Sequence, residues 1–265
     1  MSINLKTSKL FCDKIRAMSR QKRYHMKILV LKDHAALSRA GADILEQAVR
    51  EKPDCVLGLA TGETPIMLYG ELVKRHGEGL DFSRVRSVNL DEYYPLSPEN
   101  PQSYRAFMDR HLFDHINIRK ENTHVPNGLA SDAQAHCREY DALIDALGGI
   151  DVQLLGIGRN GHIGFNEPSD ELSADTHLCE LSTDTVRANS RFFDRTEDVP
   201  TRAITMGMRS IFKARRIVLL ASGKEKADAL RVLLDERIST DCPASLLHLH
   251  PDVTLICDEA AYDTK

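Results

Sequence analysis

The sequence has no long apolar run and no strong excess of charge of either sign. None of its apolar stretches approaches the roughly 18 consecutive residues that a membrane-spanning helix needs. The formal net charge is −4 over 265 residues, with 42% hydrophobic and 28% charged residues. This composition excludes a wholly disordered chain and a generally basic surface for nucleic acid. We therefore expect no membrane and no nucleic acid as a partner.

Cysteine is scarce and scattered along the chain. The six cysteines form no CxxC pair and show no metal-ligand spacing; they are Cys12, Cys55, Cys137, Cys179, Cys242 and Cys257. In a chain of this size the pattern is typical of free thiols in a reducing compartment. The sequence therefore predicts a cytoplasmic protein without a disulfide framework or a metal site.

The first 25 residues differ in charge from the rest of the chain. They carry seven lysines and arginines against one acid, Asp13, and they lack the apolar core of a secretory signal. The segment faintly resembles an organellar transit peptide, and it is too short for a DNA-binding helix-turn-helix domain with its own core. We expect residues 1–25 to be a basic extension, disordered or not native to the core, and residues 26–265 to form one folded domain.

Short apolar segments alternate with amphipathic ones from residue 26 onward. Strands are expected at 27–31, 55–60, 85–90, 151–157, 215–221 and 253–257, and helices at 35–50, 66–76, 103–115, 133–147 and 224–234. Continuous apolar strands between helices favour a mostly parallel sheet covered on both faces. The sequence therefore predicts a single doubly wound, Rossmann-like α/β domain. Ligands of such sheets bind beyond the carboxyl ends of the strands.

The expected second strand is followed by the sequence ATGETP at residues 60–65. Gly62 permits close approach of the backbone to a ligand, and Thr61 and Thr64 offer hydroxyl groups. Pro65 suits the first position of a helix, and the amino end of a helix attracts anions. A phosphate-binding loop and an ordinary capped turn are both consistent with this segment, which lacks the GK[ST] ending of a Walker loop.

Two acids, Asp91 and Glu92, follow the expected third strand. A carboxylate at a strand end could act as a general base on a carbon acid if it lies within hydrogen-bonding reach. Taken alone, the pair is more typical of a solvated turn or a helix cap, because most such acids are surface residues.

The fourth strand is followed by a glycine-rich loop, residues 156–168. Residues 156–161 match G-x-G-x-x-G, but the match lies in mid-chain, and the segment after it, which ends at Pro168, is a poor start for the helix of a dinucleotide site. The loop instead presents His162 and Glu167. Histidine titrates near neutrality and a nearby carboxylate favours its protonated form, so the pair suits proton transfer between two substrate oxygens.

Two further segments contain basic side chains that could bind an anion. Lys224 and Lys226 follow the fifth strand, and Arg187 and Arg191 lie in the polar stretch 186–193. Arginine suits bidentate binding of phosphate. Solvated surface positions are the alternative interpretation for all four side chains.

Together these segments resemble the glucosamine-6-phosphate deaminase family, whose members are also called glucosamine-6-phosphate isomerases. The resemblance covers residues 26–259 and is most specific at 158–168 (GRNGHIGFNEP), then at 90–93 (LDEY). Segments 59–65, 186–193, 249–251 and 257–259 support it. It implies a Rossmann-like domain that converts glucosamine 6-phosphate and water into fructose 6-phosphate and ammonia in amino-sugar catabolism, without a metal or organic cofactor.

The resemblance also implies roles for individual residues. His162 would open the pyranose ring by moving a proton from the anomeric hydroxyl to the ring oxygen, and Asn160 and Glu167 would orient and tune it. Asp91 would take the C2 proton and return it at C1. Residues 183–202 resemble a mobile lid. The implied phosphate-binding residues are Thr61, Gly62, Glu63 (mainly through its backbone), Thr64, Arg191 and Lys226.

This sequence differs from some members of the family at two places. Asn160 stands where some members have aspartate, so it lends no charge to His162. Other members bind the activator N-acetylglucosamine 6-phosphate through serine, arginine and lysine; here the matching positions hold Asp170, His177 and Cys179. Because an acid repels a phosphate, we expect no such activation.

Other functions stay open at this stage. A galactosamine-6-phosphate deaminase differs by the epimer at C4, which a single hydrogen bond can select. A 6-phosphogluconolactonase does not need a carbon-acid base such as Asp91. A sugar-phosphate sensor would need a DNA-binding domain, for which residues 1–25 are too few, and the G-x-G-x-x-G match leaves a dehydrogenase to be tested. The sequence decides neither a monomer nor a homo-oligomer.

Overall fold

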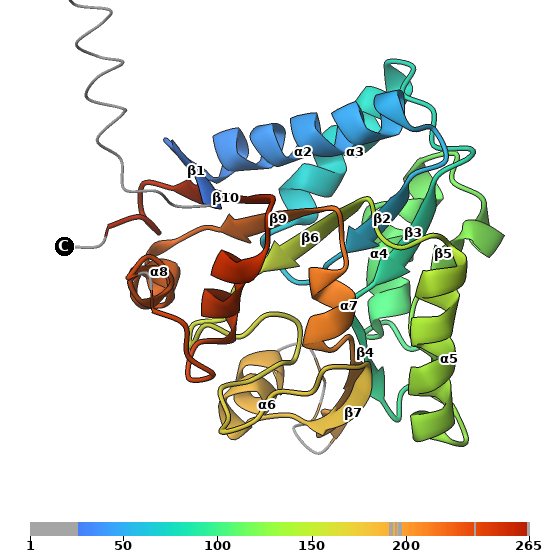
Figure 1. Cartoon of the computed structure of the whole chain (residues 1–265). Coiled ribbons are helices and arrows are strands. Elements are labelled where there is room, and N and C mark those ends of the chain that lie inside the picture. The colour runs from blue at the N-terminus through green and yellow to red at the C-terminus, as the bar shows by residue number, and fades with distance from the viewer. Residues whose placement is uncertain (1–25, 191–192, 194, 196–197, 236, 264–265) are drawn as a thin grey trace, which may run out of the picture.

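The computed structural model describes residues 26–190, 193, 195, 198–235 and 237–263 (Figure 1). The basic segment 1–25 and Arg191 lie outside the described residues. Seven parallel strands form one sheet in the order β1-β10-β9-β6-β2-β3-β5. They are β1 (Met26–Leu31), β2 (Val56–Leu59), β3 (Arg86–Asn89), β5 (Thr123–His124), β6 (Val152–Gly156), β9 (Arg216–Ala221) and β10 (Val253–Asp258). The expected α/β fold with a mostly parallel sheet is confirmed.

Helices cover both faces of this sheet, because alternate strand residues point to opposite sides. In β9, Ile217 and Leu219 join one apolar core, while Val218 and Leu220 join the other. The second core is completed by α2 (His34–Glu51), α3 (Ile66–Gly77) and α4 (Tyr104–His111). The first is completed by α5 (Ala133–Ala146), α7 (Met208–Phe212) and α8 (Ala227–Leu233). Figure 1 shows α2 and α3 on one side of the sheet and α7 and α8 on the other.

The direction of winding reverses between β2 and β6. From β2 the chain proceeds to β3 and β5 on one side, whereas β6, β9 and β10 follow on the other side. Neighbouring loops diverge at such a switch point and leave a crevice beyond the carboxyl ends of the strands. The segments after β2 and β6, residues 60–65 and 156–168, therefore meet where a ligand site is expected.

A second, antiparallel sheet of three strands was not predicted. Its order is β4-β8-β7, formed by β4 (Asp91–Tyr94), β8 (Arg202–Thr205) and β7 (His177–Glu180). Each of these strands is four residues long and carries polar side chains. The sequence therefore contains no continuous apolar run from which they could be predicted. Helix α6 (Thr183–Ser190) lies between β7 and β8 in the chain.

Two expected helices are shorter than their patterns indicate. The helix expected at 103–115 ends at His111 and continues as the 3-10 turn Phe113–His115. The helix expected at 224–234 begins as the 3-10 turn Lys224–Lys226 before α8. Further 3-10 turns occupy Lys120–Asn122 and Pro243–Leu249.

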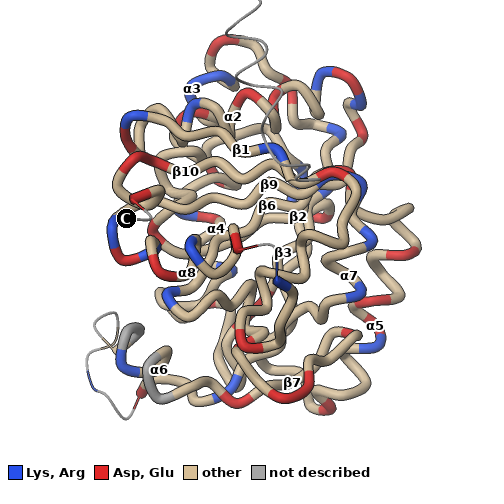
Figure 2. The backbone as a smooth tube through the Cα atoms, turned by 60° about the vertical axis from the view of Figure 1, so that its left-hand side comes forward, with Lys and Arg blue, Asp and Glu red and all other residues tan. Residues whose placement is uncertain are grey.

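Charge of both signs is spread along the described chain, with blue and red segments interspersed over the elements in Figure 2. Among the described residues, no helix combines the length and the apolar character needed to cross a bilayer.

Candidate active site

The loop after β2 opens toward the switch point. Gly62 has a φ of 95° and a side chain there would meet nothing within 4 Å, so the backbone faces open space. Thr61 and Thr64 are partly buried, and α3 begins just beyond, at Ile66. A His34 ring nitrogen lies 2.8 Å from the carbonyl oxygen of Thr64 and ties the loop to the start of α2. A positive φ beside the amino end of a helix is the geometry of an anion-binding loop.

Lys226 lies near this loop. Burial lowers the pKa of Lys226, the nearby carboxylates of Glu225 and Glu63 oppose that effect, and the guanidinium of Arg159 adds to it. Lys226 therefore lies within electrostatic reach of Glu63 and of Arg159, which follows β6 and is exposed. The two cations, Lys226 and Arg159, suit an anionic ligand.

The glycine-rich loop presents His162 and Glu167 to each other. His162 Nδ1 lies 3.2 Å from Glu167 Oε2, and the same oxygen accepts a 2.6 Å hydrogen bond from Asn160 Nδ2. The imidazole packs on Gly158, where a side chain would approach the ring to 2.3 Å. This glycine is therefore required for the position of the histidine.

Two hydroxyl groups from the segment after β7 complete the environment of Glu167. Its Oε1 accepts hydrogen bonds from Thr185 (2.6 Å) and Ser182 (3.3 Å). Burial favours the neutral acid, but the hydrogen bond and charge of His162, with the bonds from Thr185 and Asn160, outweigh it and lower the pKa of Glu167 to about 2. Glu167 is therefore an anion throughout the neutral range and holds the ring of His162 in one orientation.

Asp91 is the first residue of β4 and is 5% exposed. Burial raises the pKa of Asp91 to about 8, and the neighbouring carboxylate of Glu92 adds to the rise. Asp91 Oδ2 lies 3.7 Å from the point where a Cβ on Gly164 would stand. The carboxylate therefore faces the loop that carries His162, and its raised pKa gives it the proton affinity of a base that works near neutrality.

Hydrogen bonds through β8 join β4 to the glycine-rich loop. The N–H of Met206 donates to the carbonyl of Leu90 (2.7 Å), and the carbonyl of Met206 accepts from Asn166 Nδ2 (2.9 Å). The hydroxyl oxygen of Thr205 accepts from the N–H of Phe165 (3.1 Å). One short strand thus sets the position of the buried acid relative to the His–Glu pair.

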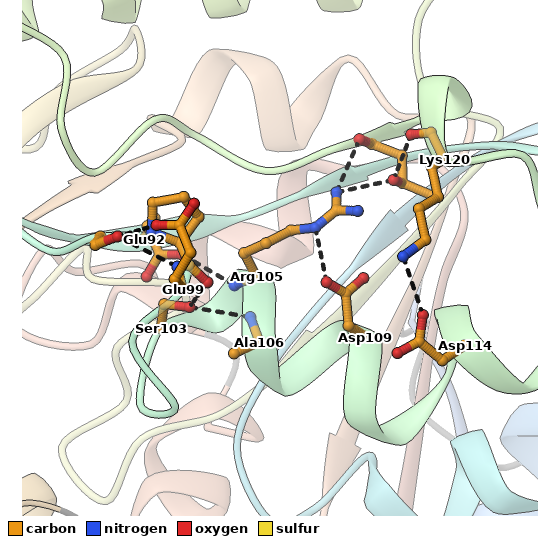
Figure 3. Close-up of polar contacts among 11 residues, drawn as sticks. Glu92, Glu99, Ser103, Arg105, Ala106, Asp109, Asp114 and Lys120 are labelled. Atoms are coloured by element: carbon orange, nitrogen blue, oxygen red, sulfur yellow. Dashed lines mark hydrogen bonds and ion pairs between the residues drawn. The ribbon is translucent and has the colours of Figure 1, made fainter.

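The carboxylate of Glu92 lies at the start of α4 (Figure 3). Its two carboxylate oxygens accept hydrogen bonds from the N–H groups of Tyr93, Tyr104 and Arg105, each at 2.9 Å. Burial raises the pKa of Glu92 to about 7, although these three donors favour the anion. Both oxygens are occupied, so Asp91 is the acid of this pair that is available to a substrate.

Three predicted cations are not placed at the site by the structure. Arg191 lies outside the described residues, and so does part of the expected lid at 183–202. Arg187 is exposed on α6 and Lys224 is exposed two residues before Lys226.

Comparison with known proteins identifies the family. A family model described as glucosamine-6-phosphate isomerases/6-phosphogluconolactonase matches residues 33–256. The chain belongs to this family. A glucosamine-6-phosphate deaminase of Thermoanaerobacter pseudethanolicus is 50% identical over 237 residues, which cover 89% of this chain and 94% of that protein. One from a Geobacillus species is 53% identical over the same coverage.

Solved structures of the family agree with this architecture. A monomeric glucosamine-6-phosphate deaminase superposes with a TM-score of 0.88 at 47% identity and covers 91% of this chain and 100% of its own. A 6-phosphogluconolactonase from Trypanosoma cruzi superposes with a TM-score of 0.73 at 20% identity, over 92% of this chain and 98% of its own. The second likeness shows a shared fold.

The sequence patterns missed several residues at the site of this family member. Arg159, Ser182 and Thr185 are single polar side chains whose neighbours are set by the fold. Only the position of Arg159, three residues after a buried strand, carried a usable signal. Among the described residues, no group of three or more His, Cys, Asp and Glu side chains is placed to hold a metal ion.

Proposed function

We propose that this protein converts glucosamine 6-phosphate and water into fructose 6-phosphate and ammonia. The observation that carries the proposal is a buried acid, Asp91, which faces the loop holding the paired His162 and Glu167 beyond the strand ends. The reaction needs one group that moves protons between oxygens and another that moves a proton between carbons. The names of the similar proteins agree with this chemistry.

His162 is proposed to open the pyranose ring. Its ring takes the proton of the anomeric hydroxyl and delivers a proton to the ring oxygen as the C1–O5 bond breaks, which leaves an open-chain aldehyde. Glu167 holds the imidazole by the 3.2 Å contact to Nδ1, so that the other ring nitrogen faces the substrate. Asn160 fixes Glu167 in turn. General acid–base catalysis of this kind requires a positioned side chain that can both accept and donate a proton, as an imidazole does.

Asp91 is proposed to move the proton between carbons. As the anion it takes the proton from C2 of the open-chain aldehyde, and a proton of the C2 ammonium group passes to O1, which gives a neutral enolamine. The same carboxyl then returns its proton to C1. The C2 iminium that results is hydrolysed by water, which yields the ketose and ammonia. The anion must form before each turnover, so kcat/KM is expected to rise with pH through the pKa of Asp91 in the free enzyme.

The phosphate is proposed to bind between the loop 61–64 and Lys226. Thr61, Gly62, Glu63 and Thr64 would supply backbone N–H groups and hydroxyls, and Lys226 a charge. Arg191, which lies outside the described residues, is proposed as a further phosphate ligand. The grouping of Lys226 with Glu63 supports this arrangement.

Replacing Lys226 by alanine is expected to raise KM for glucosamine 6-phosphate by roughly 10–100-fold, since a hydrogen bond to a charged group is worth about 1.5–3 kcal/mol. The value of kcat should change little if the phosphate is bound equally in the ground and transition states. Steady-state assays would compare this variant with Lys224→Ala, whose lysine is exposed in the same 3-10 turn. Equal KM values for both variants would remove Lys226 from the phosphate site.

The activity itself is tested by ammonia release from the purified protein. Glucosamine 6-phosphate and galactosamine 6-phosphate would be supplied in parallel. Release from the gluco substrate alone is the expected result. Release from the galacto substrate alone would keep the mechanism and change the substrate, and a protein that binds both sugars without releasing ammonia would refute the proposal. We further propose that the enzyme works in the cytoplasm on this small sugar phosphate.

A further inference from the structure

Asp258, in the Cys-Asp-Glu segment 257–259, is a buried carboxylate that the proposed reaction does not use. It ends β10 and is 5% exposed. It accepts hydrogen bonds from the Ser222 hydroxyl (2.5 Å), from the N–H of Gly223 at both oxygens (3.1 Å each), and from the N–H of Ala261 (2.8 Å). Such a set of donors holds a carboxylate in one orientation.

These bonds hold the turn that leads from β9 to Lys226. Gly223 has a φ of 91°, a conformation that needs glycine, and its carbonyl accepts a 3.0 Å hydrogen bond from the N–H of Lys226. The 3-10 turn Lys224–Lys226 and then α8 follow directly. Because Asp258 binds the two residues before this turn, it determines where the turn begins at the edge of the sheet.

We propose that Asp258 is a positioning residue for phosphate binding, because it holds the Ser222–Gly223 turn that directs Lys226 toward the loop 61–64. The inference rests on the proposed role of Lys226 in binding phosphate. Asp258 acts through the backbone, since all its bonding partners are uncharged and the carboxylates that act most strongly on Lys226 are those of Glu225 and Glu63.

Asp258→Asn tests this assignment. An amide NH₂ would face a backbone N–H and break the turn, while the volume of the side chain stays the same. KM for glucosamine 6-phosphate and the inhibition constant of inorganic phosphate are both expected to rise about tenfold, with kcat within threefold of the parent. Ser222→Ala, which removes one donor, should give a smaller change in the same direction and serves if the first variant does not fold.

A double-mutant cycle separates positioning from general support of the fold. If Asp258 acts through Lys226, adding Asp258→Asn to Lys226→Ala should raise the inhibition constant of phosphate no further. Additive increases in the inhibition constant of phosphate would overturn the proposal. An Asp258→Asn variant with a lower Tm but an unchanged inhibition constant would overturn it as well.

Asp151 offers a matched control at the amino ends of the strands, because it directly precedes β6, whereas Asp258 is the last residue of β10. Its carboxylate, 11% exposed, accepts from the N–H of Val56 and from Lys52 and Arg215. Asp151→Asn should lower Tm and leave KM unchanged; a KM shift equal to that of Asp258→Asn would make the effect non-specific. Calorimetric binding of inorganic phosphate keeps the two proposals apart, because a protein that binds phosphate through Lys226 without releasing ammonia refutes the deaminase alone.

Discussion

Replacing Asp91 by asparagine is expected to lower kcat for ammonia release by at least about 10³-fold, within the range for loss of a general base. Asparagine preserves the shape of the side chain but takes no proton from C2. The loop 61–64 and Lys226 lie outside the altered contact, so binding of the sugar phosphate should survive. Ammonia assays and calorimetric titration with glucosamine 6-phosphate would measure the two effects. Near-full turnover would show that another group is the carbon base.

The same substitution is expected to stabilise the fold in alkaline solution. The pKa of Asp91 in the folded chain, about 8, lies above the value near 4 of an exposed aspartate, so the native state binds this proton more tightly than the unfolded chain. The cost of burying the anion is therefore absent below pH about 4, grows as the pH rises, and is complete above pH about 8.

Asp91→Asn removes that cost. Each factor of ten in proton affinity corresponds to about 1.4 kcal/mol, so we expect a gain of at least about 2 kcal/mol in the free energy of unfolding at pH 9. The gain should vanish near pH 4. Denaturant unfolding at both pH values would measure it, with Asp170→Asn as the exposed control. A variant less stable than the parent at pH 9 would contradict the assigned pKa.

Replacing His162 by glutamine is expected to lower kcat by about 10²-fold or more, because glutamine cannot carry a proton between the anomeric hydroxyl and the ring oxygen. The amide can still reach Glu167, so the loop should keep its structure and KM should change less than kcat. The decrease in rate should be smallest for the fraction of substrate that is already in the open-chain form. Single-turnover measurements on cyclic and pre-opened substrate would compare the two.

Glu167→Gln provides the second test of this pair. A neutral amide would no longer hold the imidazole by charge, so kcat should fall, while the rise of kcat/KM with pH that is due to Asp91 should stay in place. The two substitutions His162→Gln and Glu167→Gln should be strongly non-additive if the side chains act as a unit. Fully additive effects on kcat would contradict the prediction that His162 and Glu167 act as a unit.

The sequence was most informative where the determinants are local. The strands expected at 27–31 and 253–257 and the helix expected at 35–50 agree with β1, β10 and α2 to within one residue at either end. Apolar alternation and helical spacing are properties of neighbouring residues, and a buried parallel strand must be apolar on both faces. The glycine-rich loop 156–168 could be recognised for the same reason, because the close contact between Gly158 and His162 occurs within one short segment.

The second sheet could not be predicted in this way. β4 pairs with β8, more than 100 residues later, and their register places Asp91 opposite Thr205. Four-residue polar strands gain their stability from such pairing and from the surfaces they cover, and not from intrinsic propensity. The sequence therefore indicated an acid after a strand, but not the sheet that buries it.

By itself, the sequence determined the parallel α/β architecture, the family, and the segments that carry Asp91, His162, Glu167 and the residues 61–64. Only the tertiary structure decided which of these groups face one another and in what charge state. Burial raises the pKa of Asp91, hydroxyls from beyond β7 help to keep Glu167 ionised, and Arg159 joins Lys226. The physical reason is that desolvation and Coulomb interaction depend on distance in space, and the distances here are set by strand pairings between segments far apart in the chain.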